Sequence, residues 1–430
     1  MTERAPDSPA GPANTPAGPA SATADERGRA VEPVTSVSRA WTARYSVAWF
    51  GLWMAYLVPI QLALPDQLSA IDHPHRIRDF GLINGLIGIA ALISLPLFGA
   101  LCDRSRSRFG RRRLWILSGT AVFAAGMVVT GQQHSWPGLA LSWLVASLGL
   151  NMATAGLTAT IADEVPDHQR GMVSSAIYGP QAIGVVVGLI ALSPVHTAGP
   201  RYLILALAAA VFVLPFSYRY VEHQTERPST SITARFLLAG LWVDHPDFGW
   251  AFGGRLLVNL GNAFGTTYLL FFLRDYLKVP DPDNSLIVLT LIYLVFTLVA
   301  TYGGGILSDR SGRRRIFVAL ASIAQASAAL LLTAAPSYPN AMIAAALLGA
   351  GYGAYMSVDQ AVVTEVLPDA RDRAKDLSIM NVGSVGPQAF GPLAASLVIG
   401  ALGGYRVLFA IAGLTSLAGA AMVYRIRSIN

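Results

Sequence analysis

Charged residues are scarce in this 430-residue chain: 31 Lys and Arg and 25 Asp and Glu make up 13% of it, whereas 53% is hydrophobic. This charged share is about half that of an ordinary soluble domain. A typical cytosolic enzyme is therefore excluded. Cysteine is also nearly absent, because Cys102 is the only one. Neither an intramolecular disulfide nor a zinc site built on several thiolates can form.

Patterns that carry covalent chemistry are missing as well. The seven histidines fall in expected loops or at expected helix ends, and no two are spaced i and i+4 as in a helical metal site. The chain has no G-x-x-x-x-G-K-[ST] sequence for a nucleotide and no grouping of nucleophile, base and orienting residue. We therefore expect no enzymatic activity, no metal site and no cofactor.

Long hydrophobic runs are abundant. A bilayer crossing needs about 20 mainly apolar residues. Two runs that qualify contain one ionisable residue each, Arg255 in 248–273 and Asp359 in 340–364. Ten more are free of charge: 45–65, 80–101, 114–133, 138–162, 172–195, 202–218, 285–307, 316–335, 377–402 and 407–424. The predicted fold class is an all-α membrane protein with twelve transmembrane helices.

The placement of positive charge predicts the orientation of the chain. If the N-terminus is cytoplasmic, 24 of the 31 Lys and Arg residues fall in the tails and loops of the inner side and six in the outer loops. Such an excess marks the cytoplasmic side. We expect a multi-pass protein of the bacterial plasma membrane with both termini in the cytoplasm. The net charge of +6 is explained by this asymmetry, so no nucleic-acid partner is expected.

Two polar segments separate the apolar parts of the chain. Residues 1–40 contain six Pro and few large apolar residues, a composition typical of a disordered tail. They lack the apolar segment and cleavage site of a signal peptide. Residues 219–247 are expected to form a cytoplasmic linker. The predicted domains are thus two six-helix bundles, 41–218 and 248–430, and we expect a monomer.

The two bundles are related by an internal repeat. Gly99–Arg113 reads GALCDRSRSRFGRRR and Gly305–Arg315 reads GILSDRSGRRR, so their Asp-Arg pairs lie 206 residues apart. A Gly-Pro-Gln-Ala sequence at 179–182 recurs at 386–389 with an offset of 207. Six helices per copy leave both copies in the same orientation, which predicts parallel repeats about an axis along the membrane normal.

Twelve crossings in a six-plus-six repeat, with G-x-x-x-D-R-x-G-R-R after the second helix of each half, resemble the major facilitator superfamily. The longer first loop, DRSRSRFGRRR, is similar to that of glycoside and disaccharide cation symporters. The resemblance implies that these loops gate the transport path; enforcement of topology by the arginines is the alternative. The residues concerned are Gly99, Asp103, Arg104, Gly110, Arg112, Gly305, Asp309, Arg310, Gly312 and Arg313.

Arg255 and Asp359 are the two charges expected within transmembrane helices. Such a charge costs about 2.5 to 3.5 kcal/mol on insertion scales, so it tends to be paired or to line a wet cavity. Their depths match, and we expect them to pair. The resemblance places their helices at the central cavity, where a carboxylate that exchanges a proton couples ion movement to transport. A permanent salt bridge that only fixes helix packing is the alternative.

Uncharged polar residues are expected at depths where they can serve a ligand. Amides and tyrosines beside apolar walls suit a neutral polyhydroxylated molecule. Hydrogen bonding between helices is the alternative for each of them. The candidate substrate-binding residues are Asn151, Gln181, Asn259, Asn262, Tyr268, Tyr355, Gln360, Asn381 and Gln388.

The sequence therefore predicts a secondary active transporter that moves a small solute by alternating access. The expected substrate is a sugar or glycoside and the expected coupling ion a proton, or else another cation. Gly179-Pro180 with Gly184 and Gly188 also resembles part of the fifth-helix motif of drug exporters, which keeps proton antiport of drugs or metabolites as an alternative. A membrane sensor that transports nothing is a third hypothesis.

Overall fold

The computed structural model describes residues 36–105, 110–220, 245–311, 314–366 and 373–427. These residues are mainly helical and contain no strand. Most of the tail predicted for 1–40 and of the linker predicted for 219–247 lies outside them. The helices of the first half are α1 (Arg39–Val58), α2 (Leu64–Ile71), α3 (Arg76–Arg104), α4 (Arg111–Thr130), α5 (Trp136–Glu164), α6 (Asp167–Leu192) and α7 (Ala198–Arg219). Those of the second half are α9 (Pro246–Thr266), α10 (Leu269–Phe271), α11 (Pro282–Ser311), α12 (Arg314–Ala334), α13 (Tyr338–Glu365), α14 (Arg373–Ala401) and α15 (Gly404–Tyr424).

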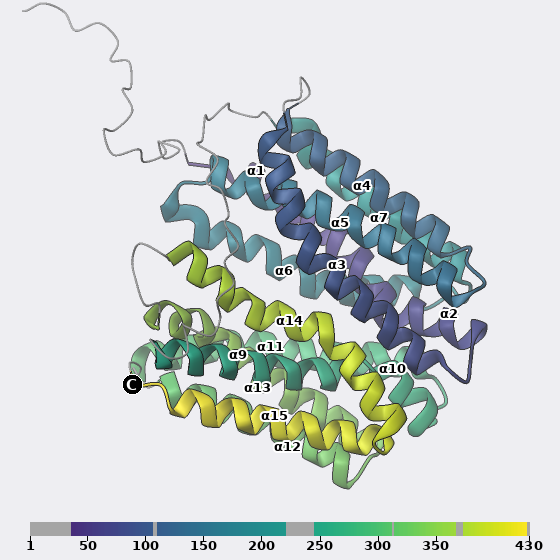
Figure 1. The fold of residues 1–430 in the computed structure, drawn as a ribbon, viewed down its shortest axis with the longest axis vertical. Coiled ribbons are helices and arrows are strands. Elements are labelled where there is room, and N and C mark those ends of the chain that lie inside the picture. The colour runs from purple at the N-terminus through teal and green to yellow at the C-terminus, as the bar shows by residue number, and fades with distance from the viewer. Residues whose placement is uncertain (1–35, 106–109, 221–244, 312–313, 367–372, 428–430) are drawn as a thin grey trace, which may run out of the picture.

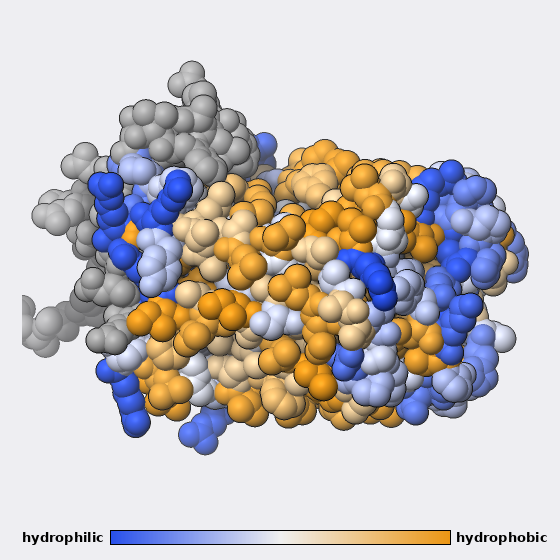
Figure 2. All heavy atoms as spheres, turned by 90° about the horizontal axis from the view of Figure 1, so that it is seen from below, coloured by the Kyte–Doolittle hydropathy of each residue, from blue (hydrophilic) through white to orange (hydrophobic). Residues whose placement is uncertain are grey.

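Eleven helical segments of the described chain are long and apolar enough to cross a bilayer, by length and composition. The twelfth expected crossing is α6, which has 26 residues, although its described apolar part is only Gly179–Leu192. Two crossings are composite. A π-helical turn, Pro59–Ala63, joins α1 to α2, and another, Phe272–Tyr276, follows α10. Figure 2 shows the resulting apolar surface as an orange band between hydrophilic ends.

The repeat of the sequence is visible in how equivalent helices begin. Ser135 precedes α5, and its hydroxyl accepts a hydrogen bond from the N–H of Gly138 (3.4 Å). Ser337 precedes α13 and accepts in the same way from Asn340 (3.3 Å). Each helix has Pro in its first turn, where the missing N–H costs nothing. The two halves thus use the same capping chemistry at the same place.

Each half packs its six crossings in the same pattern. In the first half α1 packs on α6 and α7, α5 on α3 and α4, and α4 on α7. In the second half α9 packs on α14 and α15, α13 on α11 and α12, and α12 on α15. The first half lies above the second in Figure 1. The fold is therefore the predicted all-α arrangement of two six-helix repeats.

The halves meet mainly through α3 and α14. A Cβ on Gly88 of α3 would lie 2.5 Å from the Cβ of Ala389, so only glycine permits this approach. Further along α3, Ile93 is 64% exposed and a Cβ on Gly99 would meet nothing within 4 Å. The contact is thus concentrated at the end of the molecule that carries α2 and α10, which we call the distal end (Figure 1). The described chain ends lie at the opposite end, which we call the terminal end.

The buried apolar residues show the same concentration of contacts between the halves at the distal end. The larger of two buried apolar clusters includes residues of both halves, among them Phe80 of α3 and Phe271 of α10. Their rings are 5.5 Å apart in an edge-to-face arrangement. The smaller cluster, with Phe248 and Val366, belongs to the second half alone. Close packing thus joins the halves at the distal end.

Candidate functional site

Amides and tyrosines meet in the middle of the second half. Asn259 and Asn262 lie near the centre of the crossing formed by residues 246–276, and both are buried. The hydroxyl of Tyr293 on α11 donates to Asn262 Oδ1 (3.2 Å), and that of Tyr352 on α13 donates to Asn259 Oδ1 (3.3 Å). The two tyrosine rings stack with centroids 6.5 Å apart. We call these four residues the amide–tyrosine cluster.

This cluster offers donors, acceptors and ring faces from three crossings at mid-depth. The Nδ2 group of Asn262 has no hydrogen-bond partner among the described residues. Tyr293 and Tyr352 are only half-buried. A hydroxylated ring has both an apolar face and hydroxyl groups at its edge, which match stacked aromatic rings and amides respectively.

Two hydrogen bonds and a ring contact connect the cluster to a buried ion pair. The Nδ2 group of Asn259 donates to the backbone carbonyl of Arg255, one turn earlier on α9 (2.8 Å). On α13 the ring of Tyr352 lies 6.4 Å from that of Tyr355. The Tyr355 hydroxyl donates to Asp359 Oδ1 (2.6 Å). Tyr352 of the cluster is therefore connected to the Asp359 carboxylate through one residue, Tyr355.

Arg255 and Asp359 form an ion pair, with 3.0 Å between Arg255 Nη2 and Asp359 Oδ2. Their side chains are only 6% and 5% exposed. Asp359 has two partners, the Tyr355 hydroxyl and Arg255 Nη2, whereas Nε and Nη1 of Arg255 are buried without a partner among the described residues. The pairing expected from their matching depths is therefore present.

The surroundings of the pair are closed and belong to one half. A cavity of about 10 Å³ adjoins it, lined also by Val318 of α12 and Val423 of α15. A space of this size holds about one water molecule. The pair therefore lies inside the second half, rather than on an open surface between the halves.

The two candidate tyrosines, Tyr355 and Tyr268, lie outside the amide–tyrosine cluster and make other contacts. Tyr355 is bound to Asp359, as described above. Tyr268 is buried at the distal end, where its hydroxyl lies 2.8 Å from the carbonyl oxygen of Pro392 and 3.3 Å from that of Ile77. Because these carbonyls belong to opposite halves, Tyr268 links α3 and α14.

The remaining candidate amides are dispersed. Asn151 of α5 donates to Ser94 Oγ of α3 (2.9 Å), which is a bond between helices of the first half. Gln181 is half-buried on α6, whereas Asn381 and Gln388 are exposed on α14. The side chain of Gln360 lies outside the described part of the structure. The structure thus brings Asn259 and Asn262 into one cluster with tyrosines and leaves the other described amides apart from it.

The first Gly-Asp-Arg loop forms a compact charge network around Arg112, which is nearly buried. Arg112 Nη1 lies 2.7 Å from Asp103 Oδ1, and Nε donates to Asp163 Oδ2 (2.8 Å). The guanidinium also bonds to Cys102 Sγ (3.1 Å). Arg112 therefore connects Asp103 of α3 with Asp163 of α5.

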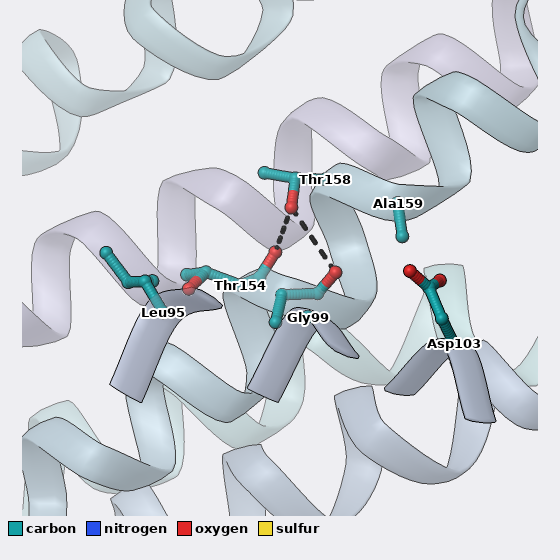
Figure 3. A pocket seen from close by; sticks show the side chains of 7 residues that line it. Leu95, Gly99, Asp103, Thr154, Thr158 and Ala159 are labelled. Carbon is teal, nitrogen blue, oxygen red and sulfur yellow. Dashed lines mark hydrogen bonds between the residues drawn. The ribbon is translucent and has the colours of Figure 1, made fainter. Parts of the chain in front are cut away.

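A groove of about 320 Å³ runs beside this network. Figure 3 shows it between Gly99 and Asp103 of α3 and Thr154 and Thr158 of α5. The Thr158 hydroxyl donates a hydrogen bond to the backbone carbonyl of Thr154 (2.8 Å), so the polar group of this side chain is already paired within α5. Asp103 is 59% exposed at the terminal end of the groove. The groove is therefore a small-residue face with a single acidic end.

The other loop residues are described in part. Gly110 has a φ of 93° and directly precedes α4, which explains why glycine ends the longer first loop. Arg104 and Arg310 are exposed, and Gly305 lies on α11 with Ser357 as its nearest neighbour. Gly312, Arg313 and the side chain of Asp309 lie outside the described part.

Tyr352 of the cluster is not among the candidate substrate-binding residues given above, and neither is Tyr293. Tyr293 lies inside an uncharged run, 285–307, together with Tyr302 and many apolar residues. Helical spacing alone gives no reason to prefer Tyr293, which bonds to Asn262, over Tyr302, which is 76% exposed. The signal is the three-dimensional approach of α11 to α9.

The sequence matches the model of the Major Facilitator Superfamily over residues 45–290 and 251–429. Multidrug resistance protein MdtG of Salmonella typhimurium is 23% identical over 301 residues, which cover 65% of this chain and 70% of that protein. The same protein of Salmonella paratyphi C is 26% identical over 219 residues, so that match spans about half (52%) of its length. A probable 4-methylmuconolactone transporter of Cupriavidus pinatubonensis is 38% identical over 112 residues, 26% of each chain.

Solved structures share the fold. The nucleoside transporter NupG aligns with a TM-score of 0.72 at 14% identity, over 90% of this chain and all of that chain. The xylose transporter XylE from E. coli, in its inward-open conformation, aligns with a TM-score of 0.66 at 16% identity, over 91% and 97%. At these identities the likeness concerns the fold alone. With the family match over nearly all of the helical region, the chain belongs to the major facilitator superfamily.

Proposed function

We propose that this protein is a secondary active transporter that moves a neutral hydroxylated small molecule, of the sugar or glycoside class, by alternating access. The observation that carries the proposal is the amide–tyrosine cluster at mid-depth. Its stacked rings offer an apolar surface, and its amides offer both donors and acceptors. Transport sites of this architecture lie near the bilayer midplane.

Flux measurements with purified protein in vesicles test this proposal. We expect a panel of sugars, glycosides and nucleosides to include a substrate that accumulates under an imposed gradient. Tyr293→Phe removes the hydroxyl that orients Asn262 and should raise the KM for that substrate about tenfold, equivalent to about 1.4 kcal/mol. Tyr302→Phe on the same helix is the matched control, because its ring is exposed. Equal kinetics of the two variants would contradict the assignment.

We assign coupling to a proton exchanged at Asp359. Asp359 is the only acidic residue of α13 before Glu365, the last residue of that helix. Its carboxylate contacts both Arg255 and Tyr355, whose ring adjoins that of Tyr352 in the cluster. Rearrangement of Tyr355 on substrate binding would weaken the ion pair and favour the protonated acid. A permanent salt bridge, the alternative, needs no such exchange.

Imposed pH and sodium gradients distinguish proton exchange at Asp359 from a permanent salt bridge. Asp359→Asn should abolish pH-driven accumulation while leaving exchange of substrate between the two sides of the vesicle. Asp281→Asn, at an exposed position before α11, is the control. Unchanged pH-driven accumulation in Asp359→Asn would make the pair structural. Accumulation driven by sodium alone would replace the proton with another cation.

A second candidate function is export of drugs or metabolites by proton antiport. It is favoured by the similarity to multidrug resistance protein MdtG over 65% of the chain. Lipophilic cations and aromatic acids therefore belong in the same vesicle panel. Proton efflux on addition of such a compound, with no response to sugars, would select this function. A chain that moves no compound under any gradient would fit the sensor hypothesis.

We further propose that the terminal end faces the cytoplasm and that the protein acts as a monomer in the plasma membrane. The arginine-rich first loop supports this orientation. In the alternate conformation a helix of the opposite half lies in the groove beside Gly99, with Asp103 at its end. This gating role comes from the family resemblance, and the open space at Gly99 is consistent with it.

A further inference from the structure

Four charged residues close a ring at the distal end. Asp66 of α2 pairs with Arg201 of α7 and with Arg274 beside α10. Asp283 of α11 pairs with the same two arginines, at 3.2 Å from Arg201 and 3.4 Å from Arg274. Charges therefore alternate around the ring. We call these four residues the distal ring.

The ring contains two kinds of ion pair. Asp66–Arg201 lies within the first half and Arg274–Asp283 within the second. The other two, Asp66–Arg274 and Arg201–Asp283, connect the halves. When the halves separate, each therefore keeps one neutral pair of its own. Within the ring, separation breaks two ion pairs but leaves no isolated charge, which is the costly outcome in a partly buried site.

Two members of the ring, Asp66 and Arg274, lie at equivalent positions of the repeats and carry opposite charges. Asp66 and Arg274 lie 208 residues apart, close to the offsets of 206 and 207 that relate the repeated motifs. Both stand at the distal end of the first crossing of their half. Equivalent positions meet at a two-fold axis, where identical residues would place like charges together. Opposite charges at these positions turn that repulsion into attraction.

Neighbouring contacts support the same junction. Arg76 at the start of α3 pairs with Asp275 of the other half (2.8 Å), and both side chains are largely buried. Tyr268 spans α3 and α14 close by. The ring thus sits over a packed apolar contact between the halves.

We propose that the distal ring is an ionic gate, in which the two pairs between the halves hold the distal side closed and the two pairs within the halves neutralise the charges when it opens. The proposal rests on the proposed alternating-access function for its physiological role. The gate itself is a property of the protein without substrate. It requires no proton, because every charge has a partner in both states.

Two double variants with the same net charge separate the two kinds of pair. In Asp66→Arg with Arg274→Asp, both contacts between the halves still join opposite charges, whereas those within each half join like charges. In Asp66→Arg with Arg201→Asp, the contacts within the first half are kept, whereas both contacts between the halves join like charges. The proposal predicts an open distal side only for the second.

The readout is the distance between the halves at the distal end. Spin labels at His134→Cys and Ala335→Cys report it, because both positions are exposed in distal loops of different halves. Cys102→Ser provides the background, since Cys102 is the only cysteine. The parent and the first double variant should give one short distance. The second should shift at least half of the population to a longer distance.

Two outcomes would overturn the proposal: identical distances in all three proteins, or equal opening in both double variants. If the second double variant does not fold, Asp66→Asn with Asp283→Asn replaces it, because it leaves only the two arginines facing each other across the halves. That variant is also expected to open, and a closed distal side would count against the gate. The distances need no substrate, so an absence of transport would contradict the proposed function and leave this result unaffected.

Discussion

Arg255 carries a charge that one carboxylate neutralises inside the second half. Removing Asp359 alone, as in Asp359→Leu, leaves this charge buried and unpaired, which should cost about 3 to 5 kcal/mol of stability. Replacing both residues with apolar ones, Arg255→Met with Asp359→Leu, should recover most of that loss. Thermal unfolding of the purified protein, followed by tryptophan fluorescence, measures both. A double variant as unstable as the single one would mean that the ionic pair itself contributes strongly to folding.

Gly110 is a second residue whose role is local. Its φ of 93° is rarely adopted by side-chain-bearing residues, so Gly110→Ala should cost about 1 to 3 kcal/mol. Gly303→Ala is the control, because a Cβ there meets nothing within 4 Å and alanine favours the helix by up to about 1 kcal/mol. Chemical unfolding of both variants tests the difference. Equal stability would show that the start of α4 relaxes freely.

At the scale of elements, the contact of α3 with α14 depends on small residues. Gly88→Ala places a methyl group 2.5 Å from the Cβ of Ala389, so the helices must separate. We expect the distal side to open, measured by the spin-label pair at 134 and 335. Gly303→Ala again serves as the control. A closed distal side in Gly88→Ala would indicate that α14 shifts along its axis instead.

Gly99, in the groove between α3 and α5, differs from Gly88 because it has free space for a side chain. Because a Cβ at this position meets nothing within 4 Å, Gly99→Leu should leave the thermal stability of the described state nearly unchanged. It should still reduce transport at least tenfold if a helix of the other half occupies the groove in the alternate conformation. Flux assays beside a melting curve test both parts. Full transport would exclude the groove as a seat for that helix.

At the scale of the whole molecule, topology is open to a direct test. In a Cys102→Ser background, a cysteine at His134 should react with an impermeant maleimide added to intact cells. A cysteine at Arg427, near the C-terminal end of the described chain, should react only after permeabilisation. Both side chains are exposed. The reverse pattern would invert the orientation predicted from the arginine-rich loops.

Much of this architecture follows from the sequence alone. Twelve apolar runs predicted the crossings, because hydrocarbon solvates no unpaired backbone group and so requires helices of a set length. The repeated Gly-Asp-Arg loops predicted the two equivalent halves, which the helix packing confirms. Arg255 and Asp359 were expected to pair because two lone charges at equal depth have few other partners.

What the sequence left undetermined was decided by the approach of helices from different parts of the chain. Spacing within α9 and α11 did not reveal that Tyr293 meets Asn262, nor that Tyr268 joins the halves. The distal ring was also invisible, because its members lie in loops or at helix ends where charges are ordinary. A sequence fixes which residues tolerate hydrocarbon, and only tertiary packing selects the neighbour that each polar group finds there.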